Sequence, residues 1–330
     1  MKLHRNMIFP GLILLAFVGP GGPETGSEAR SVSPVDAHQA QRAVLVTGAS
    51  SGIGLKITEH LAASGYFVYA GARSARDLRR LNAMENVQSI RLDVTIQEEI
   101  DAAVGTVTRA GRGLYGLVNN AGVAVVGPLI EIEEDDLQFQ LDVNLYGPYR
   151  ITKAFSPLII QEKGRITTIG SISGILAGAF SGPYSMSKHA VEAFTDALAA
   201  EMALLDVQVS VVEPGNYQSR IFESLRRRME ENDRTFEGSL FEDQLQGMFS
   251  GPADRSQYKE PDEVAEAVLD FLSDENPKRR YMVVPNQREA EITIRQAIRE
   301  LVQLNERHIY SYDRAGLIAM LDDALEASGT

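Results

Sequence analysis

A tyrosine and a lysine that stand four residues apart, Tyr184 and Lys188, are the pair in this sequence best suited to proton transfer. Both fall at the start of an expected helix, Pro183–Leu204, and residues four apart share one helix face. A free tyrosine titrates near ~10, so work near neutrality needs about 3 units of pKa shift, or ~4 kcal/mol in favour of the phenolate. A nearby lysine cation supplies part of that field. Without further context such a spacing is usually structural.

Two more polar residues give this pair its context. Ser171 follows an expected strand, Arg165–Ile169, where its hydroxyl can hydrogen-bond a substrate oxygen. Asn144 lies inside an expected helix, 134–160, in which Gly147 and Pro148 predict a local irregularity. We therefore expect Asn144, Ser171, Tyr184 and Lys188 to form one catalytic site.

A glycine-rich turn, Thr47–Gly54, directly follows the first expected strand and opens a helix. Its glycines allow a tight turn and a close approach of the backbone to a pyrophosphate, while the helix N-terminus offers unpaired N–H groups and a favourable dipole. The spacing is G-x-x-x-G-x-G. The turn predicts a dinucleotide site, with contacts from Gly48, Ser50, Ser51, Gly52, Ile53 and Gly54.

Polar groups also follow the third and fourth expected strands, as Asp93–Val94 and Asn120–Ala121–Gly122. In open α/β sheets ligands bind at the carboxyl ends of the strands, so we assign these residues to the same dinucleotide site. Singly, Asp93 could be a helix cap and the asparagine part of an ordinary turn.

The choice of cofactor depends on the residue after the second expected strand. A dinucleotide fold that prefers NAD usually has an acid there, whereas this chain has Arg73. An arginine can form charge-assisted hydrogen bonds with a 2′-phosphate, and Ser51 can add another donor. This favours NADP(H), with NAD as the alternative cofactor and a solvated surface arginine as the alternative role of Arg73.

The elements that must position these residues alternate between short apolar strands and longer helical patterns. This order is typical of a single doubly wound Rossmann-type α/β domain, a parallel sheet with helices on both faces. Further helices are expected at 53–63, 96–110 and 261–272. The expected strands are Ala43–Thr47, Phe67–Ala72, Val87–Leu92, Gly116–Asn119, Arg165–Ile169, Gln208–Val212 and Arg280–Val284.

Two stretches depart from this alternation. Residues 217–260 break it with a long polar segment, and a loop of this length inside a compact domain is usually functional or disordered. Its apolar side chains are enough to cover a hydrophobic ligand, although they could equally dock the segment on the core. After Pro285 two amphipathic helical patterns predict a C-terminal helical extension, 286–330. The domain itself is expected to span 41–285.

Composition excludes several classes of site. The net charge of -13 opposes a phosphate-neutralising face, so we expect no nucleic-acid partner. Because there is no cysteine, disulfides and thiolate catalysis are excluded. The five histidines show no metal-ligand spacing, and we expect no metal.

The first 40 residues are typical of a signal-like leader. Basic residues precede an apolar run from Met7 to Val18, which is too short for the roughly 20 residues of a membrane span but suits an export signal. Ser27 and Ala29 are candidate small residues before a cleavage point. The leader predicts export or membrane association, and the alternatives are a disordered leader or a cytoplasmic protein.

Together, the motifs from Thr47 to Ser219 resemble those of the short-chain dehydrogenase/reductase family, over roughly Ala43–Pro285. The resemblance implies that Tyr184 donates or accepts the proton, that Lys188 lowers the pKa of Tyr184 and binds the nicotinamide ribose, and that Ser171 orients the carbonyl. It also implies that Asn144 holds a water of the proton relay. The carboxamide would be bordered by Pro214, Gly215 and Ser219, where Ser219 stands in place of the usual threonine.

The resemblance is closest to the hydroxysteroid and retinol dehydrogenase branches, notably around Val212–Asn216. It implies that a small lipophilic alcohol and its ketone or aldehyde are interconverted by hydride transfer to or from NADP(H), in a homodimer or homotetramer. The alternative function is an NADP(H)-binding regulator without turnover. The complete set of Asn144, Ser171, Tyr184 and Lys188 argues against that alternative.

Overall fold

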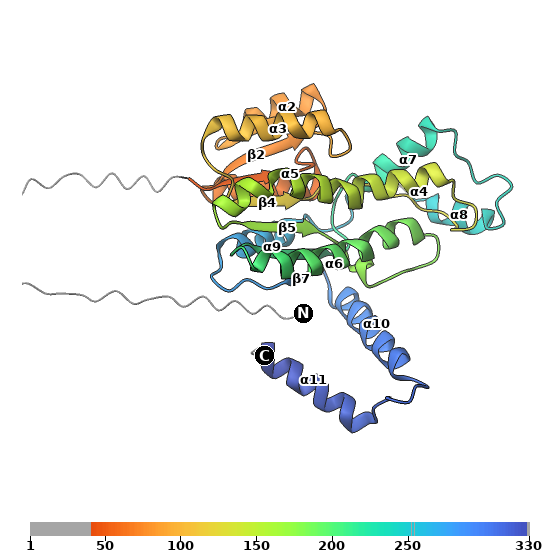
Figure 1. Ribbon diagram of the computed structural model, residues 1–330. Helices are drawn as coiled ribbons and strands as arrows, with labels where there is room; N and C mark the ends of the chain where they lie inside the picture. The colour runs from red at the N-terminus through yellow and green to blue at the C-terminus, as the bar shows by residue number, and fades with distance from the viewer. Residues whose placement is uncertain (1–40, 252, 254, 329–330) are drawn as a thin grey trace, which may run out of the picture. The chain divides into compact units, whose positions relative to one another are not determined.

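The computed structural model describes residues 41–251, 253 and 255–328, and within them seven strands form one parallel sheet in the order β3-β2-β1-β4-β5-β6-β7. The chain reverses its direction of winding between β1 and β4, which lie side by side at the centre (Figure 1). The predicted Rossmann-type fold is confirmed. The strands are β1 Ala43–Val46, β2 Phe67–Ala72, β3 Val87–Arg91, β4 Gly116–Asn119, β5 Arg165–Ile169, β6 Gln208–Pro214 and β7 Arg280–Val283.

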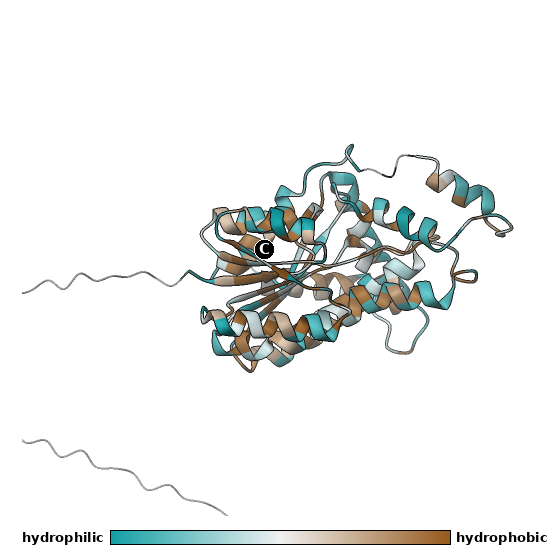
Figure 2. Ribbon diagram, turned by 90° about the horizontal axis from the view of Figure 1, so that it is seen from above, coloured by the Kyte–Doolittle hydropathy of each residue, from teal (hydrophilic) through white to brown (hydrophobic). Residues whose placement is uncertain are grey.

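Alternate residues of each central strand enter two hydrophobic layers. In β1, Val44 and Val46 face one layer, whereas Ala43 and Leu45 face the other. Helices α1 (Gly52–Ala63) and α9 (Asp262–Ser273) complete the first layer. The second layer is completed by α3 (Gln97–Ala110), α5 (Gly147–Gln161) and α6 (Gly182–Ala203). Figure 2 shows largely apolar strands between helices that carry both apolar and polar residues. The strand residues lie in both hydrophobic layers, so the sheet is buried on both faces.

The helix predicted for 134–160 is interrupted. It consists of α4 (Glu134–Leu141), a π-helix (η1, Asp142–Tyr146) and α5. Pro148 stands in the first turn of α5, directly after the π-helix, where the backbone hydrogen-bond pattern changes. The expected irregularity is therefore confirmed, and it contains Asn144.

A short helix that the sequence pattern did not predict, α2 (Ala75–Asn82), follows β2. Leu81 is its only fully buried residue, and only Leu78 and Leu81 give it an apolar face, which is a short signal in eight residues. The Ser74 side chain accepts a hydrogen bond from the Asp77 backbone N–H and caps the helix.

The 217–260 segment is more ordered than the expected loop. It contains α7 (Ile221–Glu231) and α8 (Glu242–Phe249), and Phe236 packs on Phe249 with ring centroids 4.9 Å apart. These helices are short and amphipathic, which makes them hard to separate from polar loop sequence.

The two helical patterns predicted after Pro285 are present as α10 (Gln287–Asn305) and α11 (Arg314–Ser328). The signal-like leader lies outside the described residues. Among the residues that are described, no helix is long and apolar enough to cross a membrane.

Candidate active site

The glycine-rich turn joins β1 to α1 and is held tightly against the end of β4. Gly48 and Gly52 have φ angles of 64° and 53°, which favour glycine. A Cβ on Gly54 would collide with the Asn120 Nδ2 and the Gly48 carbonyl oxygen. Ser51, the N-cap of α1, makes no side-chain capping bond. The turn therefore presents backbone N–H groups at a helix N-terminus, which suits a pyrophosphate.

Asn120 fixes the shape of this turn. Its Nδ2 donates to the carbonyl of Thr47 at 2.9 Å, and the Thr47 hydroxyl accepts from the backbone N–H groups of Asn120 and Ala121, both at 3.0 Å. Ser219 lies on the other side, where a Cβ on Gly52 would come 3.2 Å from its Cα. The structure thus brings together the dinucleotide residues predicted from three separate motifs.

At the end of β2, Arg73 is 63% exposed, and its Nη1 lies 3.4 Å from the Asp93 Oδ2. Partial burial opposes ionisation of Asp93, but hydrogen bonds from Thr95 and the charge of Arg73 hold its pKa below the usual value. Val94 is buried where a Cβ on Gly147 would lie 2.7 Å from it. Asp93 and Arg73 are therefore neighbours, as expected for two residues of one site.

A second arginine, which the sequence analysis did not assign to the site, contacts the glycine turn. Arg80 on α2 donates a hydrogen bond to the Ser50 carbonyl. It helps to line a cleft of about 550 Å³ beside the turn, in which arginines outnumber acids. The charged lining residues are Arg76, Asp77, Arg80, Arg220 and Arg227. This cationic cleft is lined by residues of the glycine turn, of α2 and of the 220–227 stretch, which are far apart in the sequence, so no local motif predicts it.

Tyr184 and Lys188 occupy successive turns at the start of α6. The Lys188 Nζ lies 5.7 Å from the centroid of the Tyr184 ring and donates a hydrogen bond to the Ile169 carbonyl at 2.8 Å. Burial lowers the pKa of Lys188 to about 8, although the negative charge of Glu192 opposes this shift. The ammonium thus links the start of α6 to the carboxyl end of β5.

Ser171 lies directly after β5 and faces Tyr184. Its Oγ accepts a hydrogen bond from the Ser173 backbone N–H at 3.0 Å and lies 3.5 Å from the Pro214 carbonyl. Burial raises the pKa of the Tyr184 phenol, while a hydrogen bond with Ser171 and the charge of Arg255 lower it. The hydroxyl groups of Ser171 and Tyr184 are therefore close enough to hydrogen-bond the same substrate oxygen.

Asn144 is turned toward the site by the π-helix. Its Oδ1 accepts from the Val123 N–H at 2.8 Å, and its Nδ2 donates to the Val123 carbonyl and to the Ser187 Oγ at 3.0 and 3.1 Å. Ser187 in turn donates to the Tyr184 carbonyl at 2.7 Å. A Cβ on Gly122 would lie 3.5 Å from the Asn144 Oδ1. Asn144 therefore connects the end of β4 to the helix that carries Tyr184 and Lys188.

The turn after β6 is backed by a residue of the C-terminal helices. The Asn216 backbone N–H donates to the Glu289 Oε2 of α10 at 2.8 Å, and a Cβ on Gly215 would collide with the same oxygen. The sequence analysis placed Pro214 and Gly215 in the site but missed Glu289. No local motif marks this residue, because its partner is far away in the sequence.

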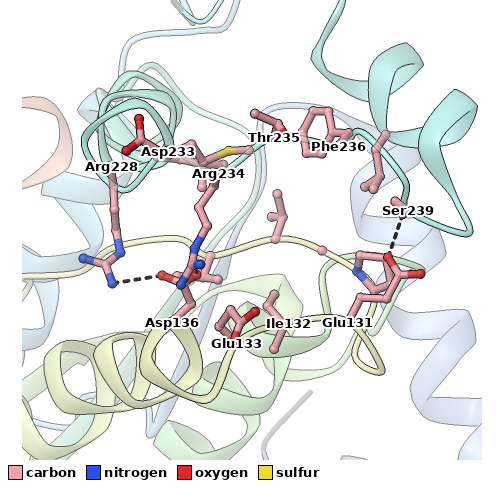
Figure 3. Close-up of a pocket in the computed structure, with 17 residues that line it drawn as sticks. Glu131, Ile132, Glu133, Asp136, Arg228, Asp233, Arg234, Thr235, Phe236 and Ser239 are labelled. Atoms are coloured by element: carbon pink, nitrogen blue, oxygen red, sulfur yellow. Dashed lines mark hydrogen bonds and ion pairs between the residues drawn. The ribbon is translucent and has the colours of Figure 1, made fainter.

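A cavity of about 310 Å³ lies between the β4–α4 connection and the 217–260 segment (Figure 3). Asp136 of α4 lies in its wall and bridges Arg228 and Arg234, each at 2.9 Å. Glu131 accepts from the Ser239 hydroxyl at 2.6 Å. The remaining wall also carries Glu133, Asp233 and Thr235, and its apolar side chains are Val125, Val126, Ile132, Leu225, Met229, Phe236 and Leu245.

In the part of the chain that the structure describes, no group of three or more His, Asp or Glu side chains could hold a metal ion. The ionisable groups beside Ser171 include Tyr184 and Lys188, which suit proton transfer.

The chain is similar to several curated dehydrogenases and reductases. It is 39% identical over 199 residues to mitochondrial D-beta-hydroxybutyrate dehydrogenase from Bos taurus, 57% of each chain, so the match spans little more than half of that relative. It is 40% identical over 184 residues to retinol dehydrogenase 5 from Mus musculus, 54% of this chain and 57% of that one. It is 34% identical over 257 residues to 3-amino-tetrahydro-pyrrolizinone reductase from Xenorhabdus hominickii, 74% of this chain and 87% of that one.

Solved structures of dehydrogenases and of a reductase are also similar to this chain. A short-chain dehydrogenase from Streptomyces avermitilis matches with a TM-score of 0.65 and 27% identity, over 81% of this chain and 95% of that one. A variant of actinorhodin polyketide ketoreductase with NADPH matches with 0.61 and 28%, over 75% and 96%. A short-chain dehydrogenase/reductase from Burkholderia phymatum in complex with NAD matches in fold, with 0.69 and 24%, over 82% and 98%.

The family comparison covers more than half of the chain. Residues 42–230 match the family described as short chain dehydrogenase, a range that contains the glycine turn, Asn144, Ser171, Tyr184 and Lys188. Together with the strand order of the sheet, this match shows that the chain belongs to the short-chain dehydrogenase/reductase family.

Proposed function

We propose that this chain is an NADP(H)-dependent oxidoreductase that interconverts a lipophilic alcohol and its ketone or aldehyde. One observation carries the proposal: Tyr184, Ser171 and Lys188 converge at the carboxyl end of β5, next to the glycine turn. A phenol, a hydroxyl and a cation in this arrangement are the groups that a carbonyl reduction or an alcohol oxidation requires.

Each of these residues has a distinct task in the proposed reaction. Ser171 would hydrogen-bond the substrate oxygen and hold it within reach of Tyr184. In reduction the Tyr184 phenol would donate a proton to that oxygen, and in oxidation its phenolate would remove the hydroxyl proton. Lys188 would stabilise the phenolate, since an opposite charge nearby favours the charged form.

The residues around the glycine turn fit a bound dinucleotide. The positive φ angles of Gly48 and Gly52 and the uncapped start of α1 form a cradle of backbone N–H groups. The nicotinamide ring of the bound cofactor supplies or accepts the hydride. Pro214 and Gly215 would border its carboxamide, on a turn that Glu289 supports from behind.

Cations at the end of β2 support NADP(H) over NAD. Arg73 is exposed beside the site, and Arg80 reaches the Ser50 carbonyl. The adjoining cleft carries Arg76, Arg220 and Arg227 in addition. A 2′-phosphate placed there would meet arginines that can bind it in a bidentate manner. The solved neighbours hold either cofactor, so the proposal depends on these arginines.

The apolar side chains in the mixed wall of the cavity between the β4–α4 connection and the 217–260 segment support a substrate with a lipophilic part. Leu225 and Leu245 are buried in it, and Phe236 closes one wall. Its volume of about 310 Å³ lies at the lower end of the range typical of small-molecule sites. We propose that this segment acts as a lid and that the cavity receives the apolar part of the substrate.

The purified chain can be tested by measuring NADPH oxidation with octan-2-one, butan-2-one and acetoacetate. We expect the highest kcat/KM for octan-2-one, because only this ketone has an alkyl chain long enough to contact several of the apolar side chains of the cavity. A preference for acetoacetate would contradict the lipophilic substrate while leaving the reaction class intact. No turnover with these or a wider panel of ketosteroids and aldehydes would contradict the reaction class.

A further inference from the structure

An arginine of the 217–260 segment is anchored at the edge of the candidate active site. The Arg255 Nε donates to the Tyr217 carbonyl at 3.0 Å, and its Nη2 donates to the Asn216 Oδ1 at 2.8 Å. Asn216 and Tyr217 directly follow the Pro214–Gly215 turn at the carboxyl end of β6. These two hydrogen bonds therefore place a guanidinium at the same edge of the sheet as Ser171 and Tyr184.

The Arg255 guanidinium packs near two aromatic rings and is partly shielded from bulk water. Its guanidinium carbon lies 4.2 Å from the centroid of the Tyr258 ring and 5.4 Å from that of Phe222. Burial lowers the pKa of Arg255, and the charges of Tyr258, Tyr184 and Glu289 oppose that shift. An arginine in a protein remains protonated, so a permanent positive charge lies between these aromatic rings.

Two cations face Tyr184, and they come from different elements. Lys188, from the same helix, lies over the ring face and directs its ammonium to the Ile169 carbonyl. Arg255, from the 217–260 segment, is held by Asn216 and Tyr217 at the edge of the site. Burial raises the pKa of the Tyr184 phenol, and the charge of Arg255 opposes this rise together with a hydrogen bond with Ser171. Because burial lowers the pKa of Lys188 to about 8, Arg255 is the cation that persists in alkaline solution.

We infer that Arg255 is a positioning residue for proton transfer, which stabilises the phenolate of Tyr184 only while the 217–260 segment is seated on Asn216 and Tyr217. The inference rests on the proposed function in assigning proton transfer to Tyr184. It adds that the position of the 217–260 segment, the proposed lid, affects the ionisation of Tyr184, the proposed base. An open segment would withdraw the guanidinium and leave the phenol harder to ionise.

The C-terminal extension takes part in this arrangement through Glu289. Its Oε2 accepts the Asn216 backbone N–H at 2.8 Å, while the Asn216 side chain accepts from Arg255. Asn286 caps α10 by accepting from the Glu289 backbone N–H at 3.0 Å, which fixes the start of that helix. Glu289 thus holds the turn in the position from which Asn216 can bind the guanidinium.

The inference can be tested on the full chain without any ligand, by NMR titration of protein labelled with ¹³Cζ-tyrosine. Loss of the resonance in Tyr184→Phe identifies the Tyr184 signal. We expect Arg255→Gln to raise the titration midpoint of Tyr184 by about one pH unit, because a nearby opposite charge is removed. Arg255→Lys keeps the positive charge, so its Tyr184 midpoint should lie close to the wild-type value. Circular dichroism over the same pH range identifies where each variant is folded.

Arg226→Gln is the matched control. Arg226 belongs to the same segment, but its hydrogen bonds to the Phe249 and Gly251 carbonyls run within the segment and do not attach it to Asn216 or Tyr217. This variant should leave the Tyr184 midpoint unchanged. An unchanged midpoint in Arg255→Gln, an equal shift in Arg226→Gln, or a failure of lysine to restore the midpoint would overturn the inference.

A kinetic measurement gives a second readout. In octan-2-ol oxidation with NADP⁺, the alkaline rise of kcat/KM should move to higher pH in Arg255→Gln by the same amount as the NMR midpoint, and stay in place in Arg226→Gln. If the chain oxidised no alcohol, the proposed function would fail, whereas the NMR titration would still decide the role of Arg255.

Discussion

The Lys188 Nζ lies 5.7 Å from the centroid of the Tyr184 ring and 2.8 Å from the Ile169 carbonyl oxygen. This position gives the lysine one hydrogen bond in a buried environment, and burial lowers its pKa from 10.5 to about 8. The native state therefore carries an unfavourable buried charge at neutral pH.

Lys188→Met should stabilise the ligand-free protein at pH 7, and the gain should shrink as pH rises. In the wild type the unfolded chain still binds the proton between pH 8 and 10.5, whereas the native state has lost it, so wild-type stability rises over that range. This rise in the wild-type free energy of unfolding between pH 8 and 10.5 amounts to about 3 kcal/mol. Urea unfolding at pH 7 and 10 measures it. The exposed Lys153→Met is the control, and a gain independent of pH would contradict the prediction.

Glu213→Gln should stabilise the protein at alkaline pH. Burial and the charge of Glu192 raise the pKa of Glu213 to about 8, while Arg280, 3.9 Å from its Oε1, opposes the shift. The stability that this group provides is complete below pH 4.5 and is lost as pH rises through 8. We expect the variant to match the wild type near pH 4.5 and to exceed it by roughly 3–5 kcal/mol at pH 8. The exposed Glu266→Gln should show no such trend in thermal unfolding.

Arg80→Ala and Arg73→Ala should each weaken NADPH use selectively. Losing one phosphate-bound arginine costs on the order of 1.5 to 3 kcal/mol, or roughly ten- to hundredfold in affinity. The kcat/KM for NADH should change little, since NADH has no 2′-phosphate. Arg79→Ala, an exposed neighbour that does not line the cleft, is the control. A wild type that prefers NADH, or variants whose preference is unchanged, would show that these arginines do not read the phosphate.

Asp136→Asn should loosen the 217–260 segment without disturbing the dinucleotide site. The Asp136 side chain is only 11% exposed and bridges Arg228 and Arg234, so the change leaves two arginines without their carboxylate. We expect the KM for octan-2-one to rise about tenfold, with NADPH binding unchanged, because the ion pairs that hold Arg228 and Arg234 in the cavity wall are weakened. The neighbouring exposed Asp135→Asn should behave like the wild type, and an unaltered KM in Asp136→Asn would count against the lid.

Much of this architecture could be predicted from the sequence. The predicted bounds of β2, β4 and β5 match those observed, because these short stretches are rich in β-branched and apolar residues, as buried parallel strands are. Tyr184 and Lys188 are recognisable from their spacing, and Asn144 from the Gly147–Pro148 pair that follows it.

The residues that could not be predicted depend on distant contacts. Arg80 lies on a helix of only eight residues, and only the fold places it at Ser50. Arg255 and Glu289 meet at Asn216 from elements that follow it by tens of residues. A lone arginine or glutamate carries no local signal of such a contact, since most are solvated on the surface.

The central claim, that Tyr184 transfers the proton, is tested most directly by Tyr184→Phe. The variant removes the phenol oxygen and keeps the ring beside Lys188, so NADPH should still bind, as measured by quenching or enhancement of its fluorescence. Ketone reduction should fall by at least about a hundredfold in kcat, the lower end of the contribution of a general acid. If the variant binds NADPH and reduces octan-2-one at a rate near that of the wild type, Tyr184 is not the proton donor.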